Sequence, residues 1–162
     1  MLELEAPDCR ASVGGIPYDT MVTWKIVVDT NVVVSGLRSR RGAAHRLLTL
    51  VGTGAFVHCL SVGLLFEYEA ALGRPGAGIR LPRRALDDIL DYLVATARQQ
   101  QIYYLWRPIL RDLSDDLVLE VAVAAGCDSI VTFNGKDFAG SERFGVRVMT
   151  PASFLAELER NR

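Results

Sequence analysis

The sequence predicts an α/β fold in which helices cover both faces of a parallel sheet. Three observations lead to this prediction. Short apolar runs alternate along the chain with helical patterns. The first of these runs is β-branched and uninterrupted, as in strands that are buried on both faces. No internal repeat breaks the alternation, and 162 residues suit one domain of ordinary size.

Five strands are expected after a loose N-terminal extension. Residues 1–20 form that extension, because they hold two prolines and a Gly-Gly pair and show no sustained period of 2 or 3.6. The functional domain then spans residues 21–162. Its strands are expected at Lys25–Val28, Ala55–Cys59, Ile102–Leu105, Ser129–Phe133 and Val146–Met149.

Five helices are expected between and after these strands. The clearest covers Pro82–Arg98, where apolar residues recur at helical spacing from Leu86 to Ala97 and the proline lies in the first turn. Ser114 is a suitable N-cap for a helix over Asp115–Ala125. The remaining helices are expected at Ala43–Val51, at Val62–Leu72, which is apolar nearly all round, and at Ala152–Arg160.

Composition argues for a cytoplasmic protein without membrane attachment. Half of the residues are apolar and 23% are charged, which excludes wholesale disorder. No window approaches the ~18 consecutive apolar residues of a membrane span. Glu3, Glu5 and Asp8 stand where a signal peptide would carry basic residues. Three widely spaced cysteines fit a reducing compartment rather than a disulfide scaffold.

Charge is distributed unevenly along the chain. The net charge of −1 excludes a uniformly basic nucleic-acid binder, but residues 36–84 carry eight arginines against two acids, a local net charge of +6. Arginine forks suit phosphate groups. A genome rich in arginine codons explains the general preference for Arg over Lys as well, although it explains the clustering less well.

Polar residues follow two of the predicted strands. Asp29 ends the first strand, Asn134 follows the fourth, and Asp137 comes three residues later. In open parallel sheets, ligands bind beyond the carboxyl ends of the strands. Turn-forming residues at strand ends are the plainer alternative for any one of these three positions.

Asp115 and Asp116 begin the predicted helix after Ser114, and their projections differ. At 100° per residue, Asp115 shares a face with the apolar residues Leu119 and Ala122, whereas Asp116 lies about 100° away. The helix dipole favours an acid in the first turn but does not explain an acid on the core face. Asp115 is therefore interpreted as a metal ligand.

A further acid comes from the helix Val62–Leu72, where spacing alone does not choose between Glu67 and Glu69. Oxygen ligands without His or Cys suit Mg²⁺ or Mn²⁺, which support phosphoryl chemistry. His45 and His58 match no zinc spacing, and the phosphate-binding, dinucleotide-binding and serine-hydrolase motifs are absent from the sequence.

Six segments of the chain carry a resemblance to a known family, namely IVVDTNVVVS (26–35), LSVGLLFEY (60–68), LGRP (72–75), LSDDLVLEVA (113–122), IVTFNGKDF (130–138) and VRVMTPASFL (146–155). In this order they resemble segments of PIN-domain ribonucleases. The resemblance runs from about Lys25 to Leu155, and its last segment resembles the branch described as VapC-like toxin components of toxin–antitoxin pairs.

The resemblance implies a three-layer α/β/α sandwich with a parallel sheet of four to five strands. It also implies an endoribonuclease that depends on Mg²⁺ or Mn²⁺. By position, Asp29, Glu67 and Asp115 are the first three acids, and Asp29 and Asp115 bind the metal ion directly. The fourth catalytic position is Asn134 or Asp137, which leaves the number of metal ions open. Residues implied to orient the site by hydrogen bonding are Thr30, Asn31 and Thr132.

The resemblance further implies partners. RNA is the substrate, and the arginines that follow the first acid are expected to hold its backbone at the lip of the site, unless they are only a solvated loop. A cognate antitoxin protein and a homodimer are also expected. The arginines concerned are Arg38, Arg40, Arg41 and Arg46.

Two other functions compete with this prediction. A receiver-type phosphoacceptor or a haloacid-dehalogenase-type phosphatase also needs an aspartate at the end of the first strand. The phosphatase needs a second Asp where Asn31 stands, and the paired acids and late lysine of a receiver are not evident. The other alternative is a catalytically weak PIN-like module that binds RNA or a protein partner.

Overall fold

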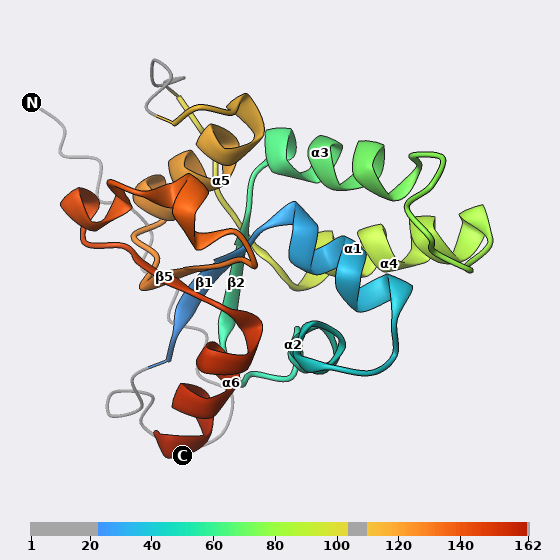
Figure 1. The fold of residues 1–162 in the computed structure, drawn as a ribbon, viewed down its shortest axis with the longest axis horizontal. Helices are drawn as coiled ribbons and strands as arrows, with labels where there is room; N and C mark the ends of the chain where they lie inside the picture. Colours follow the sequence, from blue (N-terminus) through green and yellow to red (C-terminus); the bar gives the residue numbers. More distant parts are fainter. Residues whose placement is uncertain (1–22, 104–109, 162) are drawn as a thin grey trace, which may run out of the picture.

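The computed structural model describes residues 23–103 and 110–161 and shows a five-stranded sheet (Figure 1). All neighbouring strands pair in parallel, in the spatial order β3-β2-β1-β4-β5. The strands are Lys25–Val28 (β1), Val57–Leu60 (β2), Arg98–Gln99 (β3), Ser129–Val131 (β4) and Arg147–Met149 (β5). Ile26, Val27 and Val28 of the central strand are all buried, since helices cover both faces. The predicted α/β/α sandwich is confirmed.

The helices of the described residues pack around this sheet. α5 contacts β1, β2 and β4, while α2 packs against α6. In Figure 1, α2 and α6 lie toward the bottom of the view and α3 lies toward the top. None of the described helices is long and apolar enough to cross a membrane. The α-helices are Thr30–Arg38 (α1), Ala43–Leu50 (α2), Val62–Leu72 (α3), Arg83–Thr96 (α4), Leu113–Ala124 (α5) and Pro151–Arg160 (α6), and the 3-10 helices are Gly135–Phe138 (η1) and Ser141–Phe144 (η2).

The register between β1 and β4 decides which residues meet at the carboxyl edge of the sheet. Val28 pairs with Val131, so the next residues of the two strands, Asp29 and Thr132, emerge side by side. The Asp29 N–H extends the ladder by donating to the Val131 carbonyl oxygen at 2.9 Å. Parallel pairing therefore places two residues that are 103 positions apart in the chain in direct contact.

Four strand predictions differ from the structure, two of them at one end only: β4 ends at Val131, two residues before the predicted end, and β5 begins at Arg147, one residue after the predicted start. β2 begins at Val57, two residues after the predicted start. The third strand is Arg98–Gln99, which pairs with the end of β2, whereas Ile102 and Tyr103 lie in no strand. Both residues of β3 are polar and exposed, so this short edge strand has no apolar pattern to reveal it. The rest of that predicted strand, and the predicted extension of residues 1–20, lie outside the described residues.

The sequence analysis does not predict α1. Its three consecutive valines, Val32–Val34, continue the β-branched run of β1 and have low helix propensity. Val32 and Val33 are nevertheless fully buried in the core, so tertiary packing overrides local preference at this helix.

Two predicted helix ends differ from the structure by two residues, and the other ends differ by one residue or not at all. α5 begins at Leu113 and is capped by Asp112 instead of Ser114, because the Asp112 Oδ1 atom accepts a hydrogen bond from the Ser114 N–H at 2.9 Å. α4 ends at Thr96, two residues before the predicted end at Arg98. Three of the five apolar residues on its predicted face are buried, namely Leu86, Leu90 and Leu93, and the other two, Ile89 and Ala97, are partly buried.

Gly36 permits the close approach of α1 to α2. A Cβ atom at this position would lie 2.6 Å from Leu48 Cδ1 and 3.0 Å from the Ala44 carbonyl oxygen. We predict that Gly36→Ala lowers the free energy of unfolding by about 1–3 kcal/mol, because the backbone oxygen cannot rotate away. This loss should exceed the intrinsic helix preference for Ala over Gly, about 1 kcal/mol. Urea denaturation measures the change.

Gly63 in α3 provides the matched control. A Cβ atom there would meet its nearest neighbour, Leu117 Cδ2, at 3.4 Å, an ordinary contact distance. Gly63→Ala should therefore leave the free energy of unfolding unchanged or slightly raised. Equal losses in the two variants would show that the crossing of α1 and α2 is not the cause.

Candidate active site

A cleft of about 650 Å³ opens at the carboxyl edge of the sheet. Asp29 reaches it from the end of β1, Glu67 from α3 and Asp115 from α5, while Asn134 and Asp137 come from the segment after β4. All five residues that the sequence analysis assigned to catalysis line this one cleft. Their convergence follows from the parallel sheet, whose strands all end at the same edge.

Asp29 is held by a hydrogen-bond network. Its Oδ2 atom accepts from the Thr132 hydroxyl at 2.6 Å and from the Asn31 amide at 2.7 Å. The Thr132 hydroxyl oxygen in turn accepts from Asn31 Nδ2 at 3.2 Å and from the Asn134 N–H at 3.0 Å. Asn31 and Thr132 therefore fix the orientation of this buried carboxylate.

Thr30 does not act in the same way. Its hydroxyl is buried without a hydrogen-bond partner among the described residues. Its backbone amide still lies close enough to Asp29 to favour the charged form of that carboxyl. The expected contribution of the Thr30 side chain to the site is therefore not seen in the contacts of the described chain.

Burial and like charges raise the pKa values of the acids. Desolvation raises the pKa of Asp29 above its ordinary value, despite the hydrogen bond from Thr132, and the charge of Asp137 raises it further. Burial together with the negative charges of Asp29, Asp137, Asp112 and Asp116 raises the pKa of Asp115 to about 6. Three carboxyl groups of the cleft, those of Asp29, Asp115 and Asp137, thus lie close enough to repel one another.

The helical projection of Asp115 and Asp116 is only partly right. Asp115 lines the cleft, but it is the less buried of the two residues. Asp116 is 7% exposed, and its Oδ1 atom accepts from the Leu110 N–H at 2.9 Å. The projection assumed a solvent-facing side of α5, whereas this helix is buried all round from Val118 to Ala122.

Glu67 and Glu69 face different surroundings. Glu67 lines the cleft with a side chain that is 19% exposed, and its Oε1 atom lies 3.4 Å from Arg74 Nη2. Glu69 lies outside the cleft lining, is 45% exposed and pairs with Arg83 at 2.8 Å. Of the two acids that spacing left open, Glu67 is the one at the site.

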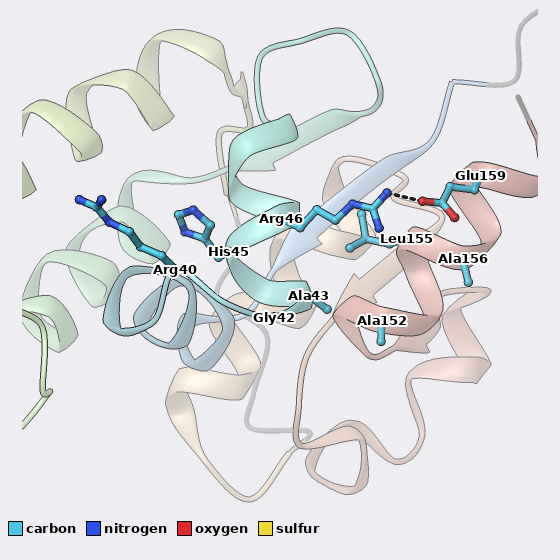
Figure 2. A pocket seen from close by; sticks show the side chains of 9 residues that line it. All are labelled: Arg40, Gly42, Ala43, His45, Arg46, Ala152, Leu155, Ala156 and Glu159. Carbon is cyan, nitrogen blue, oxygen red and sulfur yellow. Dashed lines mark hydrogen bonds and ion pairs between the residues drawn. The ribbon is translucent and has the colours of Figure 1, made fainter.

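The four arginines expected to bind RNA divide between different surfaces. Arg38 lines the acidic cleft. Arg40 and Arg46 line a separate groove of about 500 Å³ between α2 and α6 (Figure 2). In Figure 2 the Arg46 side chain extends to Glu159 of α6, with which it forms an ion pair, while Arg40 points away from that pair. Arg41 is exposed and lines neither hollow.

The cleft also contains residues that the sequence analysis did not assign to it. Arg74 follows the end of α3, where a cation is favoured by the helix dipole, and Asp112 occupies an N-cap position that favours Asp. Those two positions carry a signal, although a weak one. Phe133 also lines the cleft, and nothing in the spacing of the sequence indicates it.

The donor atoms of the cleft suit a hard divalent cation. Among the described residues, no three His, Cys, Asp or Glu side chains lie close enough to hold a metal ion by themselves. Mg²⁺ is commonly bound by one or two carboxylates, with waters completing its coordination. Asp29 and Asp115, whose carboxyl groups interact electrostatically, form a pair of this kind. The residues therefore fit Mg²⁺ or Mn²⁺ and do not fit a thiolate-binding metal.

Comparison with protein families identifies the fold and its general activity. A family model described as PIN domain matches residues 25–136, more than two thirds of the chain. The chain belongs to the PIN-domain family. This is a family of nucleases that generally depend on metal ions, and the matched segment contains Asp29, Glu67, Asp115 and Asn134. A search of curated proteins found no match.

We predict that ionisation of Asp115 destabilises the metal-free PIN domain. Its pKa is about 6 in the folded chain and 3.8 for the free side chain, so the folded state holds the proton more tightly. The resulting stabilisation is fully present below about pH 4 and is lost as the pH rises through about 6.

Urea denaturation in excess chelator, at several values between about pH 4 and pH 7, measures this effect. The Asp115→Asn variant cannot ionise at this position. The difference in the free energy of unfolding, wild type minus variant, should therefore fall as the pH rises. Because acids remote from Asp115 titrate alike in both proteins, the difference reports Asp115 together with its coupling to the neighbouring acids. A difference that is constant, or that grows with pH, would contradict the prediction.

Proposed function

We propose that this PIN domain is an endoribonuclease that depends on Mg²⁺ or Mn²⁺ and that the acidic cleft is its active site. The observation that carries the proposal is the convergence of Asp29, Asp115 and Asp137 on one cleft at the carboxyl edge of the sheet, where their like charges interact. Such a cluster gains most from a bound cation. Its place within the fold of a nuclease family supports phosphodiester hydrolysis.

The chain's own residues would have the following roles. Both side-chain hydrogen bonds to Asp29 fall on Oδ2, which fixes the carboxylate that would hold the ion, and Asp115 would provide the second carboxylate. Glu67 and Asp137 flank this pair and orient water. A bound divalent ion supplies a Lewis acid for the scissile phosphate and lowers the pKa of a water. The expected products carry a 5′-phosphate and a 3′-hydroxyl, as the motif resemblance implies.

Asp137 is proposed as the fourth acid in preference to Asn134. The charge of Asp137 raises the pKa of both Asp29 and Asp115. The backbone N–H of Asn134 instead donates to the Thr132 hydroxyl, which is a supporting role.

The proposed biological role is that of a toxin in a toxin–antitoxin pair, acting in the cytoplasm as a homodimer with a cognate antitoxin. The C-terminal segment from Val146 to Leu155 supports this role through its resemblance to such toxins.

A catalytically weak binding module remains the second candidate, because Asn134, in the segment after β4, occupies a position where many members of the family have Asp. The decisive assay incubates the purified protein with structured RNAs and Mg²⁺ or Mn²⁺. Cleavage should occur with metal and stop in excess chelator. Cleavage that persists without metal would overturn the proposal, and RNA binding without cleavage would favour the second candidate.

Substitution of the acids tests the site within the same assay. Asp115→Asn preserves the shape of the side chain but removes a charge that the cation requires, so kcat/KM should fall at least about 100-fold. Glu67→Gln should also reduce cleavage, while Glu69→Gln, on the same helix but outside the cleft, is the matched control. Loss of activity in Glu69→Gln with a normal Glu67→Gln variant would show that the cleft is not the site.

The division of the arginines predicts different responses to salt. Arg38→Ala should weaken RNA binding and reduce the slope of log K against log salt concentration by about 1, because one phosphate contact is lost. Arg46→Ala is the matched control, since Arg46 lies in the other groove and is paired with Glu159. Equal changes in slope for both variants would show that bound RNA covers both surfaces.

A further inference from the structure

Phe133 is an aromatic side chain exposed in the acidic cleft. It follows β4 between Thr132 and Asn134, and its side chain is 48% exposed. Its backbone N–H donates to Asn31 Oδ1 at 3.3 Å, so the network that holds Asp29 also holds this residue. The backbone of Phe133 is therefore held in place by the same residues as Asp29.

The fold does not require an aromatic ring at this position. The preceding residues Ile130, Val131 and Thr132 are buried, and the phenylalanine that this segment contributes to the core is Phe138, five residues further on. The hydrogen bond to Asn31 uses only the backbone N–H of Phe133. A single exposed apolar residue needs no explanation by itself. What distinguishes Phe133 is its place beside a cluster of charged groups.

The cleft brings together groups that suit the two parts of a nucleotide. Acids that suit a divalent cation lie beside Asp29, and the cations Arg38 and Arg74 line the same hollow. A nucleotide has a charged phosphate at one end and a flat base with apolar faces at the other. Phe133 is the aromatic residue among the described lining residues of this cleft, and an aromatic ring stacks on any base because every base has a π-face.

We propose that Phe133 stacks on a base next to the scissile phosphate and thereby positions the RNA for cleavage. The proposal rests on the endoribonuclease function proposed above. A base can stack on a side chain only when it is released from its own helix, so Phe133 selects an unpaired nucleotide. Phenylalanine has no hydrogen-bonding group, so it recognises the face of the base and not its edge.

Fluorescence of 2-aminopurine tests the stacking directly. The probe is a short single-stranded RNA that the wild-type protein cleaves, with 2-aminopurine at successive positions on either side of the cleavage site. Wild type and Phe133→Trp should quench the fluorescence at one adjacent position, whereas Phe133→Leu should not. For Phe133→Leu, KM should rise by about 5- to 150-fold, the range expected for the loss of one stacked base.

Phe66 provides the matched control, because it is 62% exposed but lies on α3 outside the cleft lining. Phe66→Leu should leave both KM and quenching unchanged. If Phe133→Leu melts at a lower temperature than wild type, wild-type quenching and KM in Phe133→Trp still support stacking. If both Phe133→Leu and Phe133→Trp melt normally and both lose the quenching and the wild-type KM, the stacking role is overturned.

The outcomes separate the two proposals. If wild type cleaves the RNA and Phe133→Leu matches it in both KM and quenching, the stacking role is overturned while the nuclease function stands. If wild type neither binds nor cleaves any RNA with Mg²⁺ or Mn²⁺, the proposed function itself fails.

Discussion

The hydrogen bond between the Thr132 hydroxyl and the Asp29 carboxylate is the contact on which the cleft depends. It joins the ends of two neighbouring strands at 2.6 Å. Asp29 also begins α1, because its carbonyl oxygen accepts from the Val32 and Val33 N–H groups. One residue thus ends a strand, starts a helix and presents a carboxylate, and the hydroxyl from β4 fixes the carboxylate in this arrangement.

The remaining acids are arranged around this fixed point at an electrostatic cost. Burial and neighbouring negative charges raise the pKa of both Asp29 and Asp115. Only the Glu67 carboxylate has a guanidinium group within ion-pair distance among the described cleft residues, that of Arg74. The fold carries this cost because the core beneath is strongly apolar, with β1 and β4 buried on both faces.

Much of this organisation can be predicted from the sequence, and the exceptions have physical reasons. The alternation of apolar runs and helical patterns was sufficient to predict the class of fold. α3 has the predicted bounds because residues typical of a helix start and a helix end flank it. The helix α1 was not predicted, since three valines resemble a strand until their packing is known. β3 escaped notice because an exposed edge strand of two polar residues has no apolar pattern.

The residues of the site were predictable to a similar degree. Acids at strand ends and helix starts have a positional logic, so the five assigned positions do converge on one cleft. The contrast between Asp115 and Asp116 needed the neighbours of α5, which no helical projection contains. The separation of Arg38 from Arg46 likewise depended on the path of the chain from α1 into α2.

The charges that line the cleft have a kinetic consequence. Five acids and two arginines surround the opening, and the whole chain carries a net charge of −1. A polyanion that approaches the cation-free protein is therefore not drawn toward the cleft, and association proceeds without electrostatic acceleration. Each divalent ion that enters the cleft reduces its negative charge and so favours the approach of the polyanion. The supply of ions then governs how often a nucleic acid reaches the site, in addition to what happens after it arrives.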